Sequence, residues 1–178
     1  MTHFSPAPVI GDTDDLGNRR QHLGFANRLA EGYSWQVWLA SKLLQEGLAV
    51  QIPQQQFLLN PHESKSLIAQ DEDLVVGVNQ RVWLEVKAKA RDISGFNSLY
   101  GPVKSSWDRH PVKPLAVVII STTTQDIAVM PTAFEEHWTL HRGVYDRVRG
   151  HTIDVYSCPR RYLRSYKSLV QTLREKTC

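Results

Sequence analysis

The sequence predicts an α/β fold in which a mixed central β-sheet is flanked by helices. Residues 24–45 repeat apolar side chains with the period of a helix. Residues 73–78 and 82–89 alternate apolar and polar side chains, as half-buried strands do. Residues 115–120 form a continuous apolar run, which is typical of a central strand buried on both faces.

The composition is that of a globular protein. The chain has 178 residues, of which 42% are apolar and 22% are charged. These values argue against a disordered, collagen-like or coiled-coil chain, and the length suffices to bury a core. We expect an irregular N-terminal arm over residues 1–20, where prolines and glycines surround three aspartates, and a single domain over residues 21–178.

The sequence also predicts a cytoplasmic protein without a membrane span. No apolar run approaches the roughly 20 residues that a membrane-crossing helix needs, and the first residues lack the pattern of a secretory signal. Cys158 and Cys178 are too few for a disulfide framework, which suits a reducing compartment. No phosphate-binding loop of the GxxxxGK[ST] type occurs, so no nucleotide cofactor is expected.

The first predicted helix covers residues 24–45 and ends near Gly47. We expect its core face to consist of apolar residues spaced three or four apart: Leu29, Tyr33, Val37, Ala40 and Leu44. A strand over residues 49–59, interrupted by Pro53, and a loop over residues 60–70 should follow.

The rest of the chain continues with both kinds of element. The expected order is a polar connection with one short helix over 91–114, a strand over 127–130 that partners the apolar run, a short helix over 132–141, a strand over 152–156 and a terminal helix over 160–176. The terminal helix has one apolar face: Leu163, Tyr166, Val170 and Leu173.

Asp73, Glu85 and Lys87 form the clearest chemical constellation. Glu85 and Lys87 are two apart on one strand, so their side chains share a face. If residues 73–78 and 82–89 pair as a hairpin, both apolar sets must face one core, and this condition sets the parity of the register. That parity places Asp73 on the face of Glu85 and Lys87, and it favours an odd-length connection over a two-residue turn.

Two convergent carboxylates repel each other unless a positive charge neutralises them. A hard divalent cation meets this need, and it can polarise a phosphoryl oxygen and lower the pKa of a bound water. Lys87 would orient that water or stabilise the charge that develops on the phosphate. The same spacing also fits a surface hairpin with a cross-strand ion pair, which stabilises a fold by at most about 1 kcal/mol.

The order of elements over residues 24–130 resembles the PD-(D/E)XK nuclease superfamily, which has the restriction-endonuclease-like fold. The matching features are the aspartate that leads one strand and the Glu-x-Lys of the next. The resemblance implies that Asp73, Glu85 and the backbone carbonyl of Val86 hold Mg²⁺, for which Mn²⁺ can substitute. It also implies that Lys87 is the catalytic lysine.

Glu31 matches the carboxylate that many members of this superfamily carry on the first helix, so it is expected to assist near the metal. One departure is Glu72, which stands before Asp73 where the nominal motif has proline. Asp71 and Lys89 remain open as alternatives for the first ligand and for the lysine, because each lies two residues further out on the same face.

The charge of the chain is unevenly distributed, although its formal net value is only +3. Residues 141–178 carry nine Lys and Arg against three Asp and Glu, whereas the first 140 residues carry twelve against fifteen. Such a basic segment favours contact with a polyanion. We expect DNA contacts from the loop that leaves the catalytic strand and from the terminal helix: Arg91, Asn97, Lys104, Arg109, Arg160, Arg164 and Lys167.

Other conspicuous residues are expected to be structural. Trp107 should anchor the loop that carries it. His137 and His141 are four apart, but no zinc-ligand pattern surrounds them. Neither cysteine has a convincing histidine partner for thiol catalysis.

The sequence therefore predicts a Mg²⁺-dependent endodeoxyribonuclease of the restriction, phage or mobile-element type. A homodimer is expected because a duplex has two strands to cut. Two alternatives stay open: a structure-specific nuclease similar to Holliday-junction resolvases, and a non-catalytic DNA-binding module on the same fold.

Overall fold

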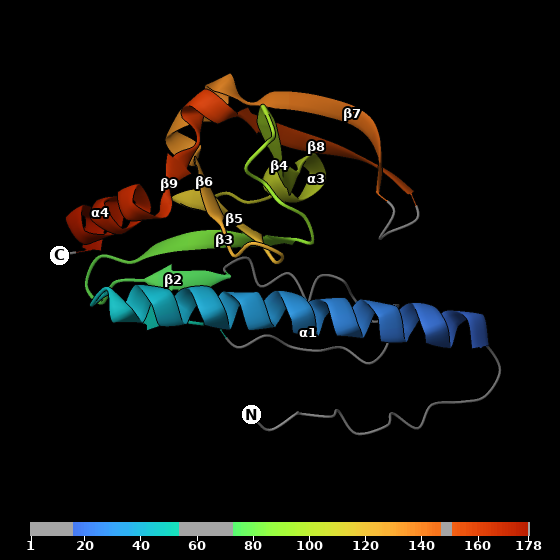
Figure 1. Cartoon of the computed structure of the whole chain (residues 1–178), viewed down its shortest axis with the longest axis horizontal. Coiled ribbons are helices and arrows are strands. Elements are labelled where there is room, and N and C mark those ends of the chain that lie inside the picture. Colours follow the sequence, from blue (N-terminus) through green and yellow to red (C-terminus); the bar gives the residue numbers. More distant parts are fainter. Residues whose placement is uncertain (1–15, 54–72, 147–150, 178) are drawn as a thin grey trace.

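A computed structural model describes residues 16–53, 73–146 and 151–177. These residues build a mixed α/β structure in layers (Figure 1). Two helices, α1 (Leu16–Gln45) and α4 (Tyr166–Thr177), pack on one face of a six-stranded sheet, and a three-stranded sheet lies on its other face. The predicted mixed sheet with flanking helices is therefore confirmed.

The larger sheet has its strands side by side in chain order: β1 (Val50–Gln51), β2 (Leu74–Val76), β3 (Val82–Lys89), β5 (Ala116–Ser121), β6 (Ile127–Pro131) and β9 (Arg164–Ser165). β3 and β5 pair in parallel, and the other neighbouring pairs of these strands are antiparallel. β1 ends before Pro53, which has no N–H to donate to a ladder. The rest of the predicted 49–59 strand and the 60–70 loop lie outside the described residues.

β2 and β3 pair in the register that the apolar parity predicted. Leu74 lies opposite Leu84 and Val76 opposite Val82, so one face of the hairpin is apolar. Residues 77–81 connect the two strands, which confirms an odd-length connection. Gly77 has a φ of +102°, and a Cβ there would overlap the backbone carbonyl of a neighbouring residue, so this position requires glycine.

The smaller sheet has the order β4-β8-β7, with bounds β4 (Ser98–Val103), β8 (His151–Pro159) and β7 (Thr139–Asp146). Sequence analysis missed β4, because Gly101 and Pro102 interrupt its apolar alternation. The predicted 132–141 helix is wrong in its second half: the 3₁₀-helix η1 (Thr132–His137) is followed at once by β7. β7 forms a hairpin with β8, the next strand of the chain, and a bulge at Arg142 and Gly143 breaks the alternation of side chains that would have indicated a strand.

The C-terminal region also departs from its prediction. A 3₁₀-helix, η2 (Arg160–Tyr162), and the short β9 precede α4, so the long helix begins later than residue 160. Leu163 packs against the core between the two sheets, whereas Val170 and Leu173 pack against the core shared with α1. Since these cores lie on opposite faces of the large sheet, one continuous helix could not serve both. The predicted short helix in the 91–114 connection is confirmed as α3 (Lys104–Trp107).

α1 is longer than predicted, and its core face differs. It begins at Leu16, so residues 16–20 of the expected irregular arm are helical, while residues 1–15 lie outside the described residues. Leu39, Ala40 and Leu43 are buried, but two members of the predicted stripe, Val37 and Leu44, are 42% and 55% exposed. The helix carries apolar residues on more than one face, so the spacing alone did not select the buried one.

The large sheet separates two apolar cores. Val118 and Ile120 of β5 face the core formed with α1 and α4, and Val117 and Ile119 face the core under the smaller sheet. Every residue of β5 is buried, which confirms the predicted central strand. β3 shares only one of these apolar faces fully, because Glu85 and Lys87 interrupt the other.

Candidate active site

Asp73 stands immediately before β2 and is held by two hydrogen bonds. The backbone N–H of Val86 donates to Oδ2 at 2.6 Å, and the side-chain amide of Gln36 donates to Oδ1 at 2.8 Å. The first bond continues the β2–β3 ladder through a side chain, so the hairpin itself positions this carboxylate. The second bond ties the carboxylate to α1.

Glu85 and Lys87 lie on β3 and form an ion pair, with Lys87 Nζ 2.7 Å from Glu85 Oε1. The Glu85 side chain is only 11% exposed, whereas that of Lys87 is 37% exposed. In the register with β5, Glu85 lies beside Val117 and Lys87 beside Ile119, whose side chains face the core under the smaller sheet. Both residues therefore occupy the face of β3 that turns away from α1.

Electrostatic coupling joins the three predicted residues. Burial raises the pKa of the Asp73 carboxyl, while the Lys87 ammonium and the Val86 N–H oppose that rise. The charge of Glu85 raises the pKa of Asp73 further. A positive charge placed beside Asp73 would favour its ionised form.

The available donors are all oxygens. They are the carboxylates of Asp73 and Glu85 and the backbone carbonyl of Val86, which points to the same side of the strand as the N–H that reaches Asp73. Within the described residues, no group of three or more His, Cys, Asp or Glu side chains could hold a metal. Mg²⁺ is usually bound through one or two carboxylates and keeps several waters, so this small donor set suits it.

Gln36 is the residue that sequence analysis missed. It is 7% exposed and lies on the buried face of α1, one turn before Leu39 and Ala40. A polar residue among the apolar residues of a buried helix face would have indicated Gln36, but the sequence predicted a different face of α1 as buried. Glu31 is exposed, and the residue of α1 that hydrogen-bonds Asp73 is Gln36. It is five residues from Gln36, about 140° around the helix.

The loop predicted to contact DNA returns to the site at its C-terminal end. His110 packs edge-on against Trp83, with ring centroids 5.7 Å apart. Trp83 occupies the same face of β3 as Glu85, two residues away, so this contact brings the end of the loop alongside the carboxylates. Asp71, the rival first ligand, lies outside the described residues, and Lys89 is part of β3 beyond Lys87.

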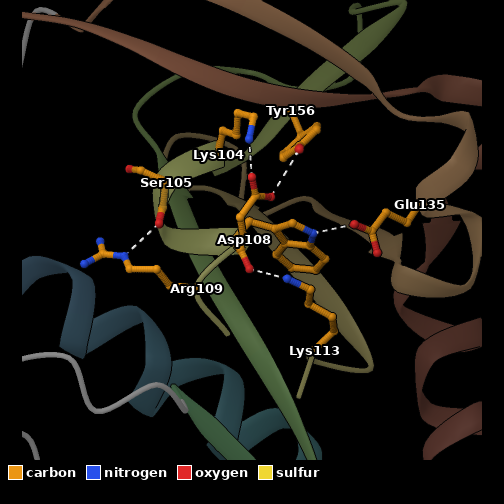
Figure 2. A network of polar contacts seen from close by, with 8 residues as sticks. Lys104, Ser105, Asp108, Arg109, Lys113, Glu135 and Tyr156 are labelled. Carbon is orange, nitrogen blue, oxygen red and sulfur yellow. Dashed lines mark hydrogen bonds and ion pairs between the residues drawn. The ribbon is translucent and has the colours of Figure 1, made fainter. Parts of the chain in front are cut away.

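A polar network holds α3 in this loop (Figure 2). The buried Trp107 donates its indole N–H to Glu135 Oε1 at 2.6 Å, which confirms its predicted role as an anchor. Lys104 pairs with Asp108, whose other carboxylate oxygen accepts a hydrogen bond from the Tyr156 hydroxyl at 3.3 Å. Lys104 is therefore partly neutralised by its own helix.

The other residues predicted to contact DNA make different contacts within the protein. Arg109 is exposed and donates to the backbone carbonyl of Ser105 at 2.8 Å. Arg91 is exposed and stacks on the Phe96 ring at 4.5 Å. Asn97 accepts the backbone N–H of Arg160 through its own carbonyl.

The Arg160 side chain is exposed, but it also hydrogen-bonds the loop that follows β3. Its guanidinium donates to the carbonyls of Ile93 and Phe96, at 3.4 and 3.3 Å, and so fastens the loop after β3 to η2. Arg164 and Lys167 are exposed. The predicted DNA-binding set therefore splits into residues that shape the loop and residues that face solvent.

The residues expected to be structural behave so. His141 Nε2 lies 2.8 Å from the hydroxyl of the buried Ser157. Cys158 is buried, and desolvation raises the pKa of its thiol to about 11, so a reactive thiolate is not formed near neutral pH.

No protein-family model matches this chain, and no curated protein matches its sequence. None of the helices in the described part of the chain has the length and apolar content that a membrane crossing requires.

Proposed function

We propose that this chain is a metal-dependent endonuclease that hydrolyses DNA phosphodiester bonds on a restriction-endonuclease-like core. The observation that carries the proposal is the gathering of Asp73, Glu85 and Lys87 around the β2–β3 hairpin. The order of elements supports it as well: a helix, an antiparallel hairpin, and then a strand parallel to the one that bears Glu85.

Asp73, Glu85 and the Val86 carbonyl would hold Mg²⁺, or Mn²⁺ in its place. The bound ion would supply a Lewis acid for the phosphoryl oxygen and lower the pKa of a water. Gln36 would keep the Asp73 carboxylate in one orientation, because the amide and the Val86 N–H each engage a different oxygen. Asp73 would then need no rearrangement to serve as a ligand.

We assign to Lys87 the role of positioning the attacking water. Its ammonium has three donors, and its partly exposed side chain can reach solvent while Glu85 stays in place. Near the phosphate, the same positive charge would stabilise the oxyanion that forms during hydrolysis. The exposed Arg109, at the end of the neighbouring loop, would contact the DNA backbone.

The test is hydrolysis of supercoiled plasmid and of branched DNA in the presence of Mg²⁺. Asp73→Ala and Lys87→Ala should abolish nicking, whereas Lys176→Ala, which removes an exposed charge on α4, should leave it unchanged. Equal nicking by all variants would exclude the assignment. Preference for the branched substrate over the plasmid would favour a junction-resolving enzyme.

One observation favours a second candidate, a non-catalytic DNA-binding module. Lys87 already pairs with Glu85, and Asp73 accepts two internal hydrogen bonds, so each carboxylate has a partner within the protein without a metal. This candidate predicts that the wild type retains DNA but does not nick it with Mg²⁺ or Mn²⁺. Binding of Mn²⁺, followed by its electron paramagnetic resonance signal and abolished by Asp73→Ala, would count against this candidate.

A further inference from the structure

A cluster of aromatic rings lies where η1 meets η2, on the far side of the large sheet from β2. Tyr162 of η2 stacks on His137 of η1, with centroids 4.2 Å apart and planes inclined by 14°. Phe134 of η1 contacts the same tyrosine at 5.7 Å. Tyr162 also packs against the core under the smaller sheet, so the cluster has a rigid base.

Two guanidinium groups lie on these rings. Arg161 is 5.0 Å from the centre of the Tyr162 ring, and Arg164 is 4.7 Å from that of Phe134. Arg164 also donates to the backbone carbonyls of Arg161 and Leu163, at 3.3 and 3.2 Å. A guanidinium stacked on a ring loses little freedom on binding an anion, and the N–H groups that these bonds leave free can donate to one.

The region around the two stacked arginines is rich in positive charge. Residues 159–171 contain four Lys and Arg and no Asp or Glu. Within the described residues, neither Arg161 nor Arg164 forms an ion pair with a carboxylate. The nearest acidic residues of η1 are already engaged, Glu135 with Trp107 and Glu136 with His137.

We propose that Arg161 and Arg164 form a phosphate-binding subsite for the nucleic-acid backbone, separate from the candidate active site. The choice of DNA as the ligand rests on the proposed function, but binding at this subsite does not require the hydrolytic reaction. β9, which carries Arg164, is three strands from β3 in the large sheet, about 14 Å at the usual strand spacing. This spacing between strands corresponds to about four nucleotide steps along a duplex, which is within the length of one bound DNA molecule.

The subsite differs from the one that the sequence predicted. Arg160 was expected to contact DNA, but its guanidinium fastens the loop after β3. Arg161, which the sequence did not indicate as a DNA contact, is exposed, and its guanidinium lies over the Tyr162 ring. Arg160 and Arg161 are both exposed, so the hydrogen bonds that Arg160 donates to the loop, and not burial, distinguish these two neighbours.

The experiment measures binding of a fluorescein-labelled DNA duplex by anisotropy, in EDTA and over a series of salt concentrations. Loss of one phosphate contact should lower the slope of log affinity against log salt by about 0.9, which weakens binding roughly eightfold at 0.1 M salt. We expect this from Arg161→Gln and from Arg164→Gln. Lys176→Gln, with the same loss of charge, should have less effect.

Unchanged affinity and slope in both arginine variants, or losses equal to that of Lys176→Gln, would overturn the subsite, as would a wild type that binds no DNA. Because the assay contains no metal, a wild type that binds through these arginines but never nicks DNA would contradict the proposed function alone. Thermal unfolding of each variant controls for misfolding. Arg161→Gln carries the test if Arg164→Gln does not fold, since the Arg161 side chain makes no hydrogen bond within the described residues.

Discussion

At the scale of single residues, Asp73 combines a proposed role in catalysis with an electrostatic cost. Burial raises its pKa, so the fold favours the neutral acid. The stabilisation from such a group is present below the unfolded-state pKa of about 3.9 and is lost as the pH rises through the folded-state pKa. Above the folded-state pKa, ionisation of Asp73 therefore destabilises the fold.

Asp73→Asn should consequently have a higher Tm than the wild type at pH 7, although it should no longer nick DNA. The asparagine oxygen can still accept the Val86 N–H, and its NH2 group can donate to Gln36 once the Gln36 amide rotates to present its oxygen. Lys87 keeps Glu85 as its partner. The difference in Tm should shrink as the pH falls through the folded-state pKa of Asp73, below which the wild-type side chain is also neutral. Calorimetry at a series of pH values measures both trends. A lower Tm for the variant at pH 7 would show that the charge of Asp73 stabilises the fold.

The positions of Asp73, Glu85 and Lys87 could be predicted because they depend on a local rule. Side chains alternate along a strand, and a shared apolar face leaves only one parity for two adjacent strands. Gln36 could not be found in the same way. A helix with apolar residues on several faces permits more than one buried stripe, and only its packing against β2 and β3 selects the stripe that contains Gln36.

At the scale of elements, the choice of buried face on α1 has a measurable consequence. Leu39→Ala should destabilise the protein by about 2–5 kcal/mol, because Leu39 is fully buried and its removal leaves a cavity. Leu44→Ala should change the stability by only about 0.5 kcal/mol, since its side chain is 55% exposed. Urea unfolding of the two variants compares them directly. Equal losses would mean that the stripe predicted from the sequence is also buried.

Two glycines offer a second matched pair, in the hairpins that shape the two sheets. Gly143 has a φ of +64° and open space around its Cβ position, so Gly143→Ala should cost only the left-handed conformation, about 1–2 kcal/mol. Gly77 has a φ of +102°, and an added Cβ would overlap the Gln80 carbonyl. Gly77→Ala should therefore be the more destabilising variant in the same denaturation assay, and it should also lower nicking, because the β2–β3 register positions Asp73. A milder effect at Gly77 than at Gly143 would contradict this account.

The two strands that escaped prediction did so for different reasons. β4 pairs with β8 across more than fifty residues, and Gly101 and Pro102 interrupt its apolar alternation. β7 forms a hairpin with β8, the next strand of the chain, but it contains a bulge in which Arg142 and Gly143 together oppose Asp154, and the Gly143 N–H donates to the Asp154 carboxylate at 3.0 Å. Local patterns identify strands with regular alternation, but not strands whose alternation is interrupted in these ways.

At the scale of the whole molecule, the acidic residues of the candidate site and the arginines of the proposed subsite occupy different parts of the large sheet. Asp73 and Glu85 lie at the β2–β3 hairpin of the large sheet. Arg161 and Arg164, which form no ion pair with a carboxylate within the described residues, lie at its β9 edge. The net charge of +3 hides this separation. The sequence shows the charge asymmetry, but only the strand order shows that three strand spacings separate β9 from β3.

One chain supplies one set of Asp73, Glu85 and Lys87, so a single copy can attack one strand at a time. The two strands of a duplex are related by two-fold symmetry, and a homodimer would present two sites in the matching arrangement. Wild-type and Asp73→Ala chains with different affinity tags, co-expressed and purified through both tags, would yield a dimer with one intact site. We expect this dimer to convert supercoiled plasmid to the nicked form without linearising it, whereas the wild-type dimer produces linear DNA. Failure to recover any doubly tagged species would exclude a stable homodimer, and linearisation at the wild-type rate would show that one site cuts both strands in turn.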